Sequence, residues 1–106
     1  MGKWSTLLAL GMPLLALAQE MPVFRLEMKD GVLTPARLEV PARQRFKLLL
    51  SNPGKTPAEF ESLPLRKEKV LAPGVTSFLV FQSLSPGEYK FYDEFHANAT
   101  GLIVAR

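Results

Sequence analysis

Short segments that alternate apolar and polar residues, each ended by a proline or glycine turn, dominate the chain after about residue 20. The segment 23–28 alternates in part before Asp30-Gly31, and 88–92 alternates after Ser85-Pro86-Gly87. A period of two places every second side chain on one face of a strand, and turns at short intervals leave little room for helices. The pattern predicts an all-β chain, a Greek-key β-sandwich of about seven strands.

The same signals place the strand boundaries. A polar loop is expected between the turn at 52–54 and residue 63, and no internal repeat or second domain is visible. We expect strands over 23–28, 37–40, 45–50, 63–71, 75–81, 88–92 and 101–104.

The first eighteen residues have the pattern of a secretory signal peptide. Lys3 precedes an apolar stretch that Gly11 and Pro13 interrupt, and Ala16-Leu17-Ala18 provides the small residues of a cleavage site. The apolar stretch is shorter than the ~20 residues that a membrane-spanning helix needs. We therefore expect cleavage after Ala18, export to the periplasm, and a single domain over 19–106.

Composition narrows the functions that are open to such a domain. The chain has no cysteine, so disulfides and thiolate ligands are excluded. The formal net charge is only +3, and basic residues cluster only at 43–47 and 66–69, without the aromatic interleaving of nucleic-acid-binding surfaces. We expect no nucleic-acid partner. Each basic cluster is either a solvated strand face or a contact for an anionic lipid or an acidic protein.

One carboxylate is predicted to point into the sandwich. Tyr89, Phe91 and Asp93 share a strand face, so Asp93 points inward if the two aromatic residues are core. A buried carboxylate is costly unless it is paired, hydrogen-bonded or bound to a metal. His96 can return over the same end of the sandwich and complete a half-site. The alternatives are that Asp93 caps a turn and that His96 is an ordinary surface residue.

Three glutamates supply further candidate ligands. If their segment is extended, we expect Glu59 and Glu61 on opposite faces, so that only one points at a given ion unless the loop bends. The alternative is that both are solvated loop charges. Glu68 either approaches the core face beside Val70 or forms a surface ion pair. Met28 is a less favoured thioether ligand and a better core residue. Oxygen ligands with one imidazole suit iron, zinc, manganese or Cu(II) better than Cu(I).

Two segments resemble the cupredoxin family, the β-sandwiches of plastocyanin type. The segment 86–96, with the sequence P-G-E-Y-K-F-Y-D-E-F-H, is similar to the family's P-G-x-Y-x-F-x-C-x-x-H pattern and precedes a glycine-led last strand at Gly101. Asp93 stands in the cysteine's place, His96 keeps the histidine, and no methionine follows. In the asparagine-led segment 52–61, Glu59 takes the place of the other histidine. Three of the four usual ligands are changed, which removes the Cu–thiolate bond of blue-copper electron transfer.

The changed pattern is similar to the EfeO-type cupredoxin-like domains associated with bacterial periplasmic iron uptake. Those domains have a Glu-aromatic-Glu segment, an acidic residue before an Ala-Pro-Gly turn, and a ligand after the P-G-x-Y strand. The resemblance implies a cupredoxin-like fold and an iron or copper ion. In this sequence they correspond to Glu59-Phe60-Glu61, Glu68 and Asp93. Together with His96 in the cupredoxin histidine place, the favoured ligands are Glu59, Glu68, Asp93 and His96, with Glu61 and Met28 less favoured.

Two functions are expected from these features. The first is a periplasmic metal-binding carrier or accessory protein in iron, alternatively copper, uptake that hands its metal to an inner-membrane permease or another uptake component. A ferroxidase-like step is compatible with that role. The second is a metal-free sandwich that acts as a protein-interaction module. A hydrolase is not expected, because the sequence offers no Ser/His/Asp or Cys/His arrangement.

Overall fold

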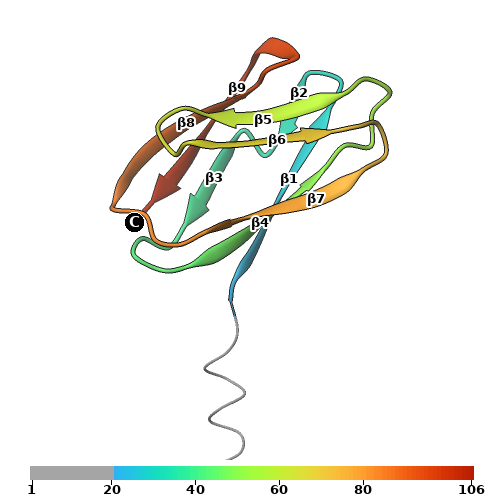
Figure 1. The fold of residues 1–106 in the computed structure, drawn as a ribbon. Coiled ribbons are helices and arrows are strands. Elements are labelled where there is room, and N and C mark those ends of the chain that lie inside the picture. Colours follow the sequence, from blue (N-terminus) through green and yellow to red (C-terminus); the bar gives the residue numbers. More distant parts are fainter. Residues whose placement is uncertain (1–20) are drawn as a thin grey trace, which may run out of the picture.

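The computed structural model describes residues 21–106 and confirms an all-β sandwich (Figure 1). The expected signal peptide at 1–18 lies outside the described residues. Within 21–106, no helix has the length and apolar character to cross a membrane. The strands are β1 (Val23–Lys29), β2 (Val32–Thr34), β3 (Arg37–Val40), β4 (Phe46–Ser51), β5 (Ala58–Ser62), β6 (Lys67–Leu71), β7 (Thr76–Phe81), β8 (Gly87–Asp93) and β9 (His96–Ala105).

The strands form two sheets that face each other. One sheet has the order β2-β1-β4-β7 and the other β3-β9-β8-β5-β6. The pairs β1–β4 and β3–β9 are parallel, and the remaining pairs are antiparallel. The edge strands β6 and β7 lie beside each other on one side of the sandwich (Figure 1). Every strand therefore has one face toward the core and one toward solvent.

Two parts of the predicted strand pattern are wrong. The expected polar loop contains β5, in which buried Ala58, Phe60 and Ser62 alternate with half-buried residues. The expected strand over 63–71 begins only at β6, because a turn precedes it. Arg66 there has a φ of 54° and donates its N–H to the Leu63 carbonyl at 3.2 Å. Together with the unexpected β2, these changes give nine strands in the described residues where about seven were predicted.

Stacked aromatic pairs lie on the core face of each sheet, between neighbouring strands. Phe46 stacks on Phe81 at 4.8 Å between ring centroids, and Phe60 stacks on Phe91 at 5.2 Å. Met28 is fully buried within this core. Large aromatic side chains contribute much of the buried apolar area of a small domain. The position of Met28 agrees with a core role for this residue.

A two-residue turn joins β1 to β2 and contacts the loop between β4 and β5. Asp30 and Gly31 both have positive φ angles, 46° and 85°, as a type I′ hairpin turn requires. The Asp30 carboxylate accepts hydrogen bonds from the Lys55 and Thr56 N–H groups at 2.9 Å and from the Thr56 hydroxyl at 2.8 Å. These bonds lower the pKa of Asp30, the Thr56 hydroxyl having the largest effect. The hairpin therefore fixes the β4–β5 loop at this end of the sandwich.

Candidate metal site

Asp93 is fully buried at the end of β8 and makes three hydrogen bonds. Its Oδ1 accepts the N–H groups of Glu59 and Phe95, each at 3.0 Å, and its Oδ2 lies 2.9 Å from His96 Nδ1. The inward direction predicted from strand alternation is confirmed. Two of the expected roles occur together, because Asp93 both caps the β8–β9 turn and pairs with the histidine.

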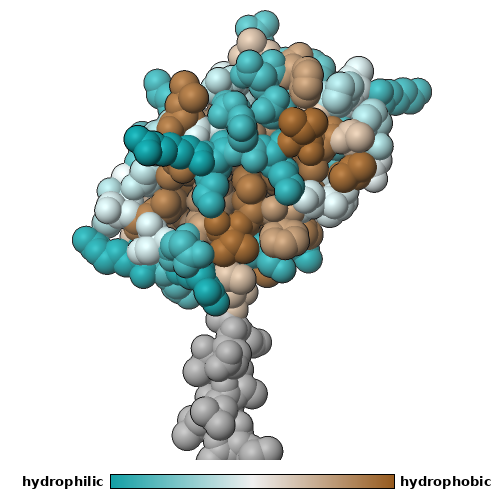
Figure 2. Space-filling view, viewed as in Figure 1, coloured by the Kyte–Doolittle hydropathy of each residue, from teal (hydrophilic) through white to brown (hydrophobic). Residues whose placement is uncertain are grey.

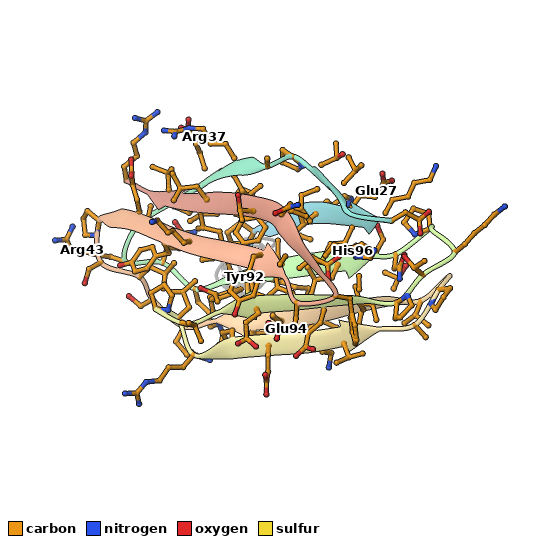
Figure 3. All side chains as sticks on the ribbon, turned by 90° about the horizontal axis from the view of Figure 1, so that it is seen from above. Glu27, Arg37, Arg43, Tyr92, Glu94 and His96 are labelled. Carbon is orange, nitrogen blue, oxygen red and sulfur yellow. The ribbon has the colours of Figure 1, made fainter. Side chains whose placement is uncertain are left out.

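His96 lies at the start of β9, between two loops (Figure 3). Its side chain is 29% exposed, and its Nε2 lies 3.4 Å from Thr56 Oγ1. A Cβ placed on Gly31 would lie 3.3 Å from the ring's Cδ2, so the hairpin glycine leaves room for the imidazole. Since Nδ1 faces a carboxylate, Nε2 is the ring nitrogen open to a ligand. A carboxylate behind a histidine is common among metal-binding histidines.

Glu59, Glu61 and Glu68 form a second group, which we call the carboxylate cluster. The expectation that Glu59 and Glu61 point to opposite faces is wrong, because residues two apart in a strand share a face. Both lie on the outer face of β5, with fully buried Phe60 between them pointing inward. Glu68 is directly opposite Glu61 in the β5–β6 register. One carboxylate oxygen from each of the three lies within 4.8 Å of the others.

The glutamates of the carboxylate cluster repel one another when all three are ionised. Burial, followed by the negative charge of Glu68, raises the pKa of Glu59 and of Glu61. Carboxylates directly opposite each other on a sheet repel. The neighbouring Lys67 and Lys69 lie on the other face of β6, together with the buried Leu71. Protons or a multivalent cation would relieve the repulsion.

Two residues beside the carboxylate cluster were not identified as candidates from the sequence. Tyr92 is paired in register with Glu61, and Glu94 follows at the β8–β9 turn (Figure 3). Burial and then the charge of Glu94 raise the pKa of the Tyr92 hydroxyl. Strand alternation could have placed Tyr92 on the outer face, because its neighbours Phe91 and Asp93 were both predicted to point inward.

The structure does not bring the four favoured ligands into one cluster. Glu59 and Glu68 lie on the outer face of the five-stranded sheet, together with Glu61. Asp93 points to the inner side, and His96 sits at the end of the sandwich. Met28 is on β1 of the other sheet, and its side chain is buried in the core. The predicted residues therefore divide into the carboxylate cluster and the Asp93–His96 pair.

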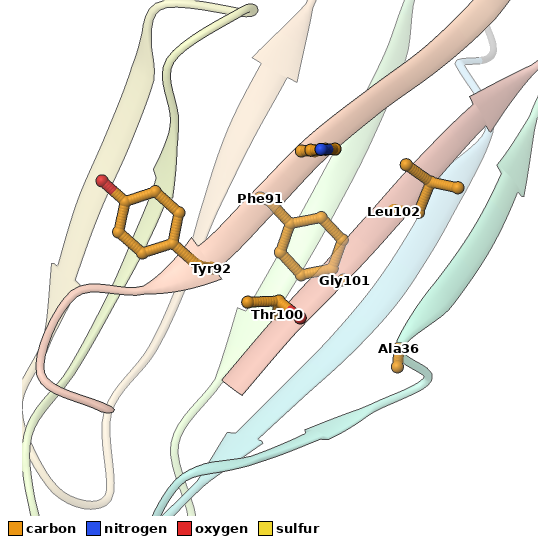
Figure 4. A pocket seen from close by; sticks show the side chains of 7 residues that line it. Ala36, Phe91, Tyr92, Thr100, Gly101 and Leu102 are labelled. Atoms are coloured by element: carbon orange, nitrogen blue, oxygen red, sulfur yellow. The ribbon is translucent and has the colours of Figure 1, made fainter. Parts of the chain in front are cut away.

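A hollow of about 450 Å³ lies near Tyr92 (Figure 4). None of the predicted ligands lines it. Its lining consists of Ala36, Lys90, Phe91, Tyr92, Thr100, Gly101 and Leu102.

Comparison with known proteins identifies the family of the chain. A family model described as a cupredoxin-like domain matches residues 4–105. An uncharacterized protein of Rickettsia prowazekii (strain Madrid E) is 32% identical over 81 residues, which cover 76% of this chain and 65% of that protein. The chain thus matches somewhat less than two thirds of that relative's length.

Solved structures with the same fold include two cupredoxins. A purple cupredoxin from Nitrosopumilus maritimus is 18% identical, with a TM-score of 0.60, covering 78% of this chain and 99% of that one. Auracyanin A of Chloroflexus aurantiacus, described as a "blue" copper protein, is 10% identical, with a TM-score of 0.70, covering 82% and 100%. Identities this low show the fold alone. The residues present do not fit a blue-copper centre, because the chain has no cysteine and the Asp93 carboxylate bonds the histidine. The chain belongs to the cupredoxin-like domain family, and it lacks that family's blue-copper cysteine ligand.

Proposed function

We propose that this chain is a periplasmic metal-binding protein, a carrier or accessory protein in iron uptake that hands its metal to a membrane permease. The observation that carries the proposal is the carboxylate cluster: three glutamates within 4.8 Å of one another, two of them with raised pKa values. Carboxylate oxygens are ligands for hard cations, and clustered carboxylates hold iron in di-iron carboxylate proteins. Iron is favoured over copper because of the resemblance to iron-uptake domains.

The Asp93–His96 pair supplies a second place for a metal ion. His96 Nε2 faces the β4–β5 loop, while Asp93 holds the ring through Nδ1. An imidazole suits Cu(II) and zinc as well as iron. Copper would therefore compete with iron at the Asp93–His96 pair. The two groups predict different metal preferences, and variants of each can separate them.

Sequence features support export of the protein to the periplasm and transfer of its metal to a permease. The signal-like segment at 1–18 supports a periplasmic location, and the resemblance to iron-uptake domains supports a permease partner. The carboxylate cluster is partly exposed, with Glu68 on the surface. An exposed site suits a carrier, since a metal that must be passed on has to be reachable by the acceptor.

The test is a thermal melt of the metal-free protein with Fe(II) under anaerobic conditions, Cu(II), Zn(II) and Mn(II). A ligand that binds only the folded state stabilises it by about 2.7 kcal/mol at a hundredfold excess over Kd. We expect Fe(II) to raise the melting temperature, and the double variant Glu59→Gln/Glu68→Gln to abolish the rise. His96→Ala should remove a Cu(II) effect and leave the Fe(II) effect. Glu88→Gln, on exposed β8 surface, is the matched control. If no metal shifts the native protein, the carrier role is refuted.

The alternative is a metal-free interaction module, and one observation favours it. No side-chain nitrogen or oxygen atom buried within 21–106 lacks a hydrogen-bond partner, and Asp93 makes all its bonds within the chain. The buried carboxylate is thus stabilised without a metal. Under this alternative the melts show no metal effect, and the glutamates form contacts with a basic partner.

A further inference from the structure

The two sheets have four edge strands, and three of them carry features that discourage pairing with another chain. β2 has only three residues, and β6 alternates Lys67, Glu68 and Lys69. β3 has exposed Arg37 and Glu39, and Glu39 also bonds Arg106 at 2.7 Å. Short length and charged side chains are the usual protections of edge strands.

The fourth edge strand, β7, has none of these features. Its six residues, with the sequence T-S-F-L-V-F, include no charge and no proline. β7 pairs only with β4, so alternate N–H and C=O groups on its other side have no strand partner within 21–106. Phe78 is 48% exposed, and the preceding Val75 is 40% exposed. An uncharged, apolar free edge is a template for an added strand.

Lysines from both basic sequence clusters converge on this edge. Lys47 of β4 lies over the outward-facing Phe78 ring, with Nζ 4.6 Å from the ring centroid. Lys67 of β6 lies over the inward-facing Phe81 ring at 5.6 Å. Lys69 is on the same face of β6 as Lys67. Figure 2, in the same view as Figure 1, shows hydrophobic surface around β6 and β7 with hydrophilic side chains beside it. The free edge is thus uncharged, apolar over 78–81, and has lysines on both of its faces.

We propose that β7 accepts an extended acidic segment of a partner protein as an added strand. Backbone groups of the partner would pair with the free side of β7, and its apolar residues would cover Phe78. Its acidic side chains would meet Lys47 on one face and Lys67 and Lys69 on the other. A second copy of this chain is a poorer occupant, because pairing two β7 edges would bring the lysines of both copies together.

This inference is independent of the metal function. The carboxylate cluster lies on the outer face of β5 and β6, whereas Lys67 and Lys69 lie on the other face of β6. An experiment could refute metal binding and still support strand addition, and the reverse result is equally possible. Variants of the two sites therefore give separate results.

The test uses a synthetic eight-residue peptide, acetylated and amidated, in which valine or threonine alternates with glutamate. We expect it to bind the full chain and to slow amide hydrogen exchange in Thr76–Phe81. The charge reversal Lys67→Glu/Lys69→Glu should weaken binding at least about tenfold and allow a lysine-containing version of the peptide to bind. Lys90→Glu, on the outer face of β8, is the matched control and should change nothing.

Two further peptides separate strand pairing from charge attraction alone. Each has the same side chains, but its backbone nitrogens are N-methylated at either the odd or the even positions. Pairing on one edge predicts that one methylated peptide loses binding and the other keeps it. Equal binding by both, absence of peptide binding, or exchange protection outside β7 would overturn the proposal. Concentration-dependent dimerisation that protects β7 without peptide would overturn it in favour of a second copy.

Discussion

Replacing Asp93 by alanine tests whether this buried carboxylate organises the end of the sandwich. The substitution leaves the N–H groups of Glu59 and Phe95 without their acceptor and removes the contact with His96 Nδ1. A buried donor that loses its partner costs about 1–3 kcal/mol. Two such donors and the lost contact with a half-buried histidine give an expected loss of about 3–5 kcal/mol. That is a large part of the roughly 5–10 kcal/mol expected for a domain of this size.

The assay is urea unfolding of the metal-free protein, followed by circular dichroism. With a slope of about 1–1.5 kcal/mol per molar urea, the midpoint should fall by about 2–5 M. Asp93→Asn is the matched control, because its amide oxygen can still accept both N–H groups. The asparagine variant should lose only about 1 kcal/mol. A loss below about 1 kcal/mol in the alanine variant, or equal losses in both variants, would refute the role assigned to the two N–H bonds.

Three further outcomes follow from the same physical reasoning. Gly101→Ala should cost about 2–3 kcal/mol in thermal melts, because its Cβ would overlap the Phe91 ring and lie 2.7 Å from a backbone carbonyl; an unchanged melt would contradict this packing. Asn52→Ala should cost about 2–4 kcal/mol and speed exchange of the Gly54 amide, since buried Asn52 donates two hydrogen bonds and accepts that amide at 3.0 Å. The raised pKa values of Glu59 and Glu61 mean that the folded state holds protons more tightly; stability of the metal-free protein should therefore rise as pH falls from 7 toward 4.5, and Glu59→Gln/Glu61→Gln should flatten that rise in melts at several pH values.

The sequence pattern was sufficient for the fold class and for most strands, because period-two alternation and Pro/Gly turns act locally. It failed at β5, where the inward positions 58 and 62 are alanine and serine and give a weak apolar signal. It also failed at 63–66, where a positive φ at Arg66 closes a turn that no glycine marks. The error at β5 thus reflects a weak local signal. At 63–66 a local signal was overlooked, because Pro64 stands at the second position of the turn that the Arg66 N–H closes on the Leu63 carbonyl.

For the candidate site, only the contacts between residues close in sequence could be predicted. The inward direction of Asp93 and its closeness to His96 depend on spacing within 89–96, and these predictions are confirmed. The pairing of Glu61 with Glu68 depends on the β5–β6 register, which the unexpected turn sets. The contact of Asp30 with Thr56 joins residues 26 apart in sequence. Such contacts are properties of the assembled sandwich.

Glu59 contacts both groups of candidate ligands, one through its backbone and the other through its side chain. Its N–H donates to Asp93, while its side chain belongs to the carboxylate cluster on the opposite face of the sheet. An ion bound by Glu59, Glu61 and Glu68 could reach Asp93 only if the Glu59–Asp93 hydrogen bond broke and β5 twisted away from β8. Burial of Phe60 between the two glutamates opposes that twist. Under the proposed metal function, the carboxylate cluster and the Asp93–His96 pair should therefore act as two separate sites with different ion preferences.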